Sequence, residues 1–156
     1  MERIKTTEIP RIKSISKEDF ITHYFKPQKP VIIEDLAKSW PAYNTWSLDY
    51  IQSKAGDQIV PLYNNEPTNS VVPAKKMKLY DYIELLKTQP TDLRMFFYNV
   101  LQKMPELTKD FSYPDIGLKF FKKLPVMFFG GKGSKVLAHY DMDLADLVHF
   151  HFHGTK

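Results

Sequence analysis

The chain has 156 residues, of which 43% are hydrophobic, 14% aromatic and 26% charged, and it contains no cysteine. This composition is that of one ordinary globular domain and excludes a collagen-like, coiled-coil or fully disordered chain. The lack of cysteine excludes a disulfide framework, a cysteine-based zinc finger, an iron–sulfur cluster and a cysteine nucleophile. Any bound metal must therefore be held by histidine and carboxylate side chains.

The formal net charge is +4, from 22 Lys and Arg residues against 18 Asp and Glu residues. The lysines are spread along the chain, so the charge favours a solvated surface, with nucleic-acid binding as an alternative. The stretch from Glu2 to Pro10 has no apolar run of the kind found in signal peptides, and no apolar window is long enough to span a membrane. We expect a protein of the cytoplasm without a membrane partner.

Three short helices are predicted in the first ninety residues. Ser16, followed by acidic residues, is typical of an N-cap, and the apolar spacing after it predicts a helix that Pro27 ends. Ser47 begins a second helix, which ends near Gly56. The third helix is closed by Pro90 and carries its apolar side chains on one face: Leu79, Tyr82, Ile83 and Leu86.

Strands are predicted between and after these helices. Residues 29–34 are β-branched and bounded by prolines, which indicates a buried strand, and Trp40-Pro41 marks a turn. Further strands are expected at residues 58–63, 94–98 and 126–129, with a loop or hairpin region at 64–73 and a Gly-rich turn at 130–134.

The clearest strand signal is the period-two alternation of Leu147–His153. It places His149, His151 and His153 on one face and Val148, Phe150 and Phe152 on the other. With helices early and strands late, we expect an α+β protein with a mainly β core in its C-terminal half.

Four of the five histidines lie within the last 18 residues, and His139-Tyr140-Asp141 is the pair of most interest. On a strand, residues i and i+2 point to the same face about 6.6–6.8 Å apart, so both side chains can converge on one ion. An imidazole and a carboxylate are two of the three ligands of a 2-His-1-carboxylate Fe(II) site. Alone, the tripeptide also fits a surface strand end that happens to carry His and Asp.

Several other motifs, and their order along the chain, add to the evidence for an Fe(II) site. The sequence resembles the JmjC-related, cupin-like 2-oxoglutarate oxygenases from about Ile15 to Lys156. The motifs that carry the resemblance are Lys29–Ile33, Trp40–Ala42, Trp46-Ser47, Phe129–Ser134, His139–Asp143 and His151–Lys156.

The resemblance implies one domain over residues 1–156. Residues 1–14 would be an extension, 15–124 a helical and mixed lead-in, and 125–156 the first strands of a partial double-stranded β-helix, the jelly roll of cupins. It further implies Fe(II) held by His139 and Asp141, and 2-oxoglutarate as co-substrate. The family reaction would convert 2-oxoglutarate to succinate while a C–H bond is hydroxylated.

Four residues are candidates for holding the co-substrate: Lys156, Tyr98, His149 and His151. The resemblance puts the Lys156 ammonium opposite the distal carboxylate of 2-oxoglutarate, and a mobile point charge with three donors suits that role. Tyr98 falls where the family often uses a tyrosine hydroxyl, whereas Phe96 is interpreted as core packing. Val136 is a departure, because some relatives carry a hydroxyl residue there and valine has no donor.

The histidines of the last strand leave three interpretations open. In the first, His149 and His151 face the co-substrate. In the second, they are half-buried polar partners on a barrel wall. In the third, His149, His151 and His153 form a separate zinc site. The family's third iron ligand is a histidine well downstream, and His149–His153 follow Asp141 too soon to match it.

These 156 residues are therefore expected to be the N-terminal portion of an oxygenase that modifies a protein side chain or, as a second choice, RNA. We expect the chain alone to be weakly active or inactive. The rival interpretation is a non-catalytic binding module, stabilised as a homodimer or by a partner that covers an exposed β edge.

Overall fold

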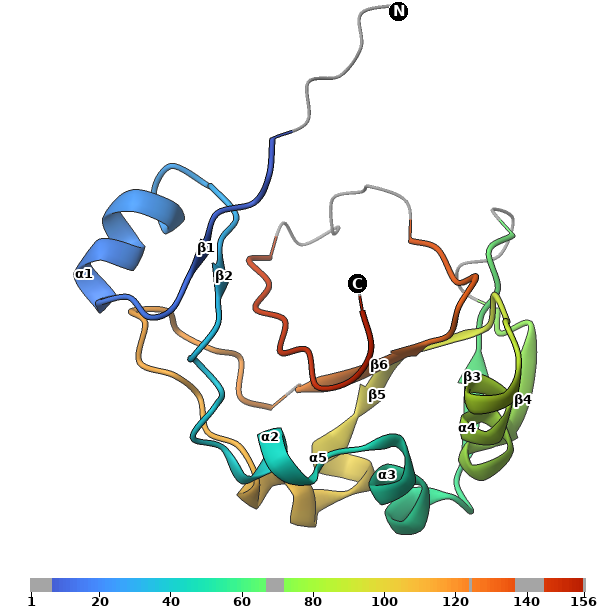
Figure 1. Ribbon diagram of the computed structural model, residues 1–156. Helices are drawn as coiled ribbons and strands as arrows, with labels where there is room; N and C mark the ends of the chain where they lie inside the picture. Colours follow the sequence, from blue (N-terminus) through green and yellow to red (C-terminus); the bar gives the residue numbers. More distant parts are fainter. Residues whose placement is uncertain (1–6, 67–71, 124, 137–144, 156) are drawn as a thin grey trace, which may run out of the picture.

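The computed structural model describes residues 7–66, 72–123, 125–136 and 145–155 (Figure 1). The helical elements are α1 (Lys17–Phe20), the π-helical turn η1 (Ile21–Phe25), α2 (Pro41–Thr45), α3 (Leu48–Ala55), α4 (Leu79–Thr88), α5 (Val100–Lys103) and the 3-10 helix η2 (Pro105–Lys109). The strands are β1 (Arg11–Ile12), β2 (Ile32–Ile33), β3 (Ile59–Leu62), β4 (Lys75–Lys78), β5 (Arg94–Asn99) and β6 (Val126–Gly130).

All three predicted helices are confirmed, and so are the serine caps predicted for the first two. The Ser16 hydroxyl accepts a hydrogen bond from the Asp19 amide at 3.1 Å, and the Ser47 hydroxyl accepts one from the Tyr50 amide at 3.1 Å. The sequence did not predict α2, because Trp40-Pro41 was interpreted as a turn only. Pro41 is the first residue of α2, a position where its missing N–H is not needed and its fixed φ suits a helix.

The strands of the described residues pair into three separate two-stranded sheets: β1 with β2 in parallel, and β3 with β4 and β5 with β6 antiparallel. The strands predicted at 58–63, 94–98 and 126–129 are confirmed as β3, β5 and β6. The strand predicted over 29–34 is confirmed only as the two-residue β2, and the prediction that it is buried is wrong. Only Ile32–Ile33 pair, because β1 offers two residues as a partner, and Ile32 is 36% exposed.

The expected strand over 147–153 is also wrong, since none of these residues is in a strand. The alternation itself is real: Val148, Phe150 and Phe152 are half-buried, whereas the odd-numbered residues between them are exposed. The reason is that the apolar face packs against tryptophan rings rather than beside a neighbouring strand. Figure 1 shows this segment between the β1–β2 pair and the β5–β6 pair.

The α+β mixture is observed, but the described residues form no closed jelly roll and their core is not mainly β. Helices and strands contribute together to one buried cluster that joins α3, α4, β3, β5, α5 and η2. Its members are Ile51, Ala55, Val60, Leu62, Leu79, Tyr82, Ile83, Met95, Tyr98, Val100, Met104 and Leu107. None of the helices in the described part of the chain is long and apolar enough to cross a membrane.

Tyr82 connects α4 to the β5–β6 sheet through its hydroxyl group. This fully buried hydroxyl donates to the carbonyl oxygen of Leu93 at 3.0 Å and to that of Phe129 at 3.2 Å. Burial raises the pKa of Tyr82, so the phenol stays protonated and keeps donating. The Tyr82 side chain thus links α4 to the start of β5 and to the end of β6.

We expect Tyr82→Phe to lower the free energy of unfolding by about 1–3 kcal/mol, because two buried carbonyl groups lose their shared donor while the ring still fills the core. Urea unfolding followed by circular dichroism measures the change. Tyr80→Phe is the matched control, since Tyr80 is 52% exposed on the same helix. Equal losses in the two variants would contradict the role given to the Tyr82 hydroxyl.

Candidate functional site

The Gly-rich turn that follows β6 is confirmed, and a side chain at Gly131 would be crowded while one at Gly133 would be strained. A Cβ on Gly131 would lie 2.8 Å from the Leu86 side chain of α4, and Gly133 has a φ of +107°, which L-residues rarely adopt. The Ser134 amide closes the turn by donating to the Gly131 carbonyl at 3.1 Å. The chain therefore leaves β6 close against α4.

Asn65 holds the end of this turn, a role that the sequence did not predict. Its side-chain amide donates to the Gly133 carbonyl at 3.0 Å, and its Oδ1 accepts from the Lys135 amide at 2.9 Å and from the Arg94 guanidinium at 3.0 Å. Arg94 also donates to the Lys135 carbonyl. We call Asn65 and Arg94 the turn clamp. It fixes the chain four residues before His139.

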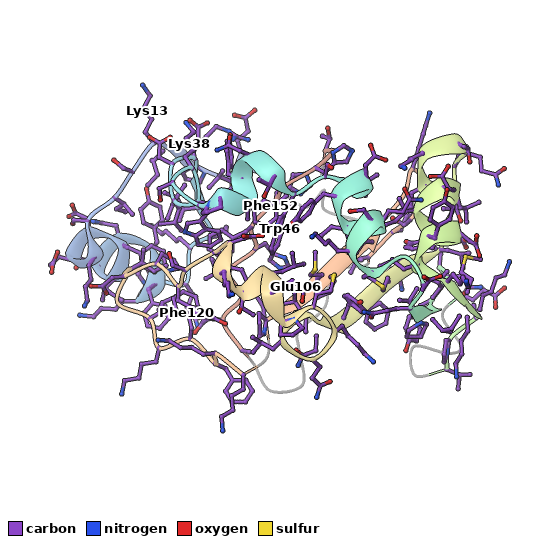
Figure 2. The ribbon with its side chains drawn as sticks, turned by 90° about the horizontal axis from the view of Figure 1, so that it is seen from below. Lys13, Lys38, Trp46, Glu106, Phe120 and Phe152 are labelled. Atoms are coloured by element: carbon purple, nitrogen blue, oxygen red, sulfur yellow. The ribbon has the colours of Figure 1, made fainter. Side chains whose placement is uncertain are left out.

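Two tryptophans hold the segment 145–155. The Phe150 ring centroid lies 4.4 Å from that of Trp40, and the Phe152 centroid lies 4.8 Å from that of Trp46. The Trp46 indole N–H donates to the Asp110 carboxylate at 3.0 Å, which fixes the ring. Figure 2 shows Trp46 and Phe152 side by side near the centre of the molecule.

This packing turns the histidines of the segment outward. His149, His151 and His153 are exposed, so the interpretation as half-buried partners on a barrel wall is wrong. The three imidazoles do not form the zinc site either, because the described residues contain no group of three or more His, Asp or Glu side chains placed to hold a metal. His149 contacts β6, with its ring centroid 6.0 Å from that of Phe128.

Tyr98 is 5% exposed and lies in the core. Burial, with a smaller contribution from Glu106, raises its pKa to about 12, so the hydroxyl is protonated at neutral pH. It donates to the side-chain oxygen of Gln58, whose NH₂ group donates in turn to the Lys103 carbonyl at 3.0 Å. The hydroxyl is therefore already used in a link from β5 through Gln58 to α5.

The pairing of β5 with β6 separates Tyr98 from His149. Tyr98 lies opposite Met127, so both side chains share one face of the ladder, and Phe128 points to the other face. A register shift between Met95 and Tyr98 is what lets both of those residues reach the core. Since His149 contacts Phe128, the structure does not bring the two candidate co-substrate residues together.

The remaining candidates, His139, Asp141 and Lys156, lie outside the described residues. Their assignment as iron ligands and co-substrate contact stays a prediction. Phe96 is half-buried with its ring centroid 4.2 Å from that of Tyr63, which agrees with its interpretation as packing.

The amino-acid sequence is similar to that of proteins already classified. A family model described as a cupin-like domain matches residues 17–156. The lysine-specific demethylase JMJ21 of Arabidopsis thaliana is 36% identical over 110 residues, which are 69% of this chain and 11% of that protein. The lysine-specific demethylase 8 of Xenopus tropicalis is 32% identical over 112 residues, 70% of this chain and 25% of that protein.

A third relative is the tRNA wybutosine-synthesizing protein 5 of Mus musculus. It is 22% identical over 161 residues, which cover 86% of this chain and 50% of that protein. The chain thus spans between 11% and 50% of the length of these three relatives.

The turn clamp leads to a local prediction. Asn65→Ala should remove protection against hydrogen exchange at the Lys135 amide, because Asn65 Oδ1 is its acceptor, and should cost about 1 kcal/mol of stability since the site is exposed. Exchange measured by NMR tests this. Asn64→Ala is the control, because the Asn64 side chain bonds only to the Glu66 amide among the described contacts. Unchanged exchange at Lys135 in Asn65→Ala would refute the clamp.

Proposed function

The chain belongs to the cupin-like domain family, and from this membership we propose that it serves an Fe(II)- and 2-oxoglutarate-dependent oxygenase of the hydroxylase or demethylase type. The observation that carries the proposal is the family match over residues 17–156, a range that includes His139, Asp141 and Lys156. Two of the relatives are named as lysine-specific demethylases, which supports a protein side chain as the substrate. The relative named for tRNA wybutosine synthesis supports RNA as the second choice.

The donor chemistry of the chain fits iron. His139 and Asp141 offer one imidazole nitrogen and one carboxylate oxygen, the ligand types of non-haem Fe(II) sites, and the chain has no thiolate that would favour softer metals. When bound, iron would activate dioxygen, which is the oxidant, and 2-oxoglutarate would supply two electrons as it loses CO2 and becomes succinate. The role of this chain is to bind the metal through those two residues and to pair the Lys156 ammonium with a carboxylate.

Among the other proposed co-substrate residues, His149 is better supported than Tyr98. His149 is exposed and lies against Phe128 of β6, and an imidazole is a side chain that can hydrogen-bond a carboxylate. The Tyr98 hydroxyl would first have to leave Gln58, and it faces the core. His151 is exposed on the same side of its segment as His149 and is retained as a second contact.

Metal titration of the 156-residue polypeptide tests the ligand assignment. We expect Co(II), used as a spectroscopic substitute for Fe(II), to bind weakly, and His139→Ala or Asp141→Ala to weaken binding by at least about tenfold, since loss of a ligand should exceed the loss of an outer-sphere contact. His23→Ala is the control, because this exposed histidine lies on η1. Binding that is unchanged in His139→Ala would overturn the assignment.

Succinate formation with Fe(II) and 2-oxoglutarate tests the activity of the same polypeptide. We expect little or none, because only two of the three expected metal ligands are present in it. Robust turnover that His139→Ala abolishes would support the oxygenase and overturn the expectation of inactivity.

A non-catalytic binding module is the second candidate function, and the edge of β6 favours it. Within the described residues β6 pairs as a strand only with β5, and Phe128 on this strand is 56% exposed. A strand edge with an apolar side chain is a template for pairing with another chain. A homodimer in which two β6 edges pair would give the backbone groups of each edge hydrogen-bond partners.

Light scattering over a range of protein concentrations distinguishes this alternative. A homodimer predicts a molar mass that rises from 18.3 kDa toward twice that value, and Phe128→Glu should restore the monomer by placing a charge at the edge. Phe121→Glu is the control, because Phe121 is 72% exposed and lies outside any strand. A mass of one chain at every concentration would exclude the homodimer.

A further inference from the structure

The segment Lys119–Lys123 combines three exposed lysines with an exposed aromatic ring, and we call it the basic aromatic surface. Lys119, Lys122 and Lys123 are all exposed, and Phe121 between them is 72% exposed. The segment is part of the connection between η2 and β6 and contains no helix or strand. In the sequence, this segment is separate from the residues proposed to bind iron.

The lysines of this surface have no carboxylate partner among the described residues, whereas four lysines elsewhere in those residues do. Lys17 pairs with Asp115 at 3.1 Å, Lys78 with Asp57 at 2.9 Å, and Lys87 with Glu84 at 2.9 Å. Across residues 7–66, 72–123, 125–136 and 145–155, Lys119, Lys122 and Lys123 form no ion pair with a carboxylate. The Lys122 ammonium lies 5.6 Å from the Tyr113 ring centroid, so its contact within the chain is with an aromatic ring rather than with a carboxylate. Three positive charges within five residues are therefore available to an external anion.

Tyr113 holds the segment from its inner side. The Tyr113 hydroxyl donates to the Lys122 carbonyl at 3.2 Å, and its ring centroid lies 5.4 Å from that of Phe120. Burial raises the pKa of Tyr113, so the hydroxyl remains a donor at neutral pH. Phe120 thus packs inward while Phe121 stays outside. Figure 2 shows Phe120 at the side of the molecule remote from α4.

We propose that the basic aromatic surface binds single-stranded nucleic acid. Lysines that are free of carboxylates attract successive phosphates, and an exposed ring stacks on an unpaired base. An anionic membrane fits less well, because interfacial binding uses an amphipathic helix with a broad apolar face, and this segment has no helix and one outward ring. This binding does not depend on the iron site.

Fluorescence anisotropy with a labelled single-stranded RNA of about 12 nucleotides tests the proposal at several salt concentrations. Neutralising three phosphates on a single strand predicts a slope of about −2 for log K against log[salt]. Lys122→Gln/Lys123→Gln should reduce that slope by about 1.4 and weaken binding at low salt. Phe121→Ala should weaken binding by about 5- to 100-fold with little change in slope, because it removes stacking rather than charge.

The matched control is Lys75→Gln/Lys76→Gln, which removes the same charge from β4, on the opposite side of the molecule in Figure 1. This variant should keep the affinity and nearly the full slope. Equal losses in both double variants would overturn the proposal by showing that only net charge matters. Tighter binding to phosphatidylserine vesicles than to RNA, or no RNA binding at low salt, would also overturn it. Unchanged RNA binding by His139→Ala would support a surface independent of the iron site, so this proposal and the oxygenase can fail separately.

Discussion

The packing of two tryptophans against two phenylalanines determines how the C-terminal part of the described chain lies. Trp40 and Trp46 flank α2, and Phe150 and Phe152 contact one ring each. Each such ring pair adds about 0.5–1.5 kcal/mol beyond the burial of its area. Because the two phenylalanines are separated by one residue, their docking leaves the histidines between and beside them exposed. The outward direction of His149, His151 and His153 is therefore a consequence of aromatic packing.

The proposed iron ligands lie in the sequence between two anchored stretches. Before them, the turn clamp and the glycines of the turn hold residues 130–135 against α4 and the end of β5. After them, the tryptophans hold residues 150–152. The chain is thus held by contacts on both sides of this stretch, at residues 130–135 and at residues 150–152.

Local signals in the sequence were sufficient where one residue and its near neighbours decide the structure. Ser16 and Ser47 begin helices because a cap bonds to an amide three residues ahead, and α4 follows from the spacing of its apolar residues. The same reasoning missed β4, since Lys75–Lys78 has three lysines and no apolar alternation to indicate a strand. Its pairing with β3 became visible only in the folded chain. Asn65 was likewise interpreted as an ordinary loop residue, because its side-chain partners are between 29 and 70 positions away.

The sequence by itself determined the membership in the cupin-like family, the candidate ligands His139 and Asp141, and the two alternating faces of residues 147–153. Only the tertiary structure decided what each face meets. The apolar face packs on Trp40 and Trp46 and forms no strand, and the register shift in β5 turns Tyr98 toward Gln58 and away from His149. The physical reason is that apolar and polar alternation in the sequence indicates which side chains lie on the same face of a segment. Strand pairing and register, by contrast, depend on residues that are distant in sequence and close in space.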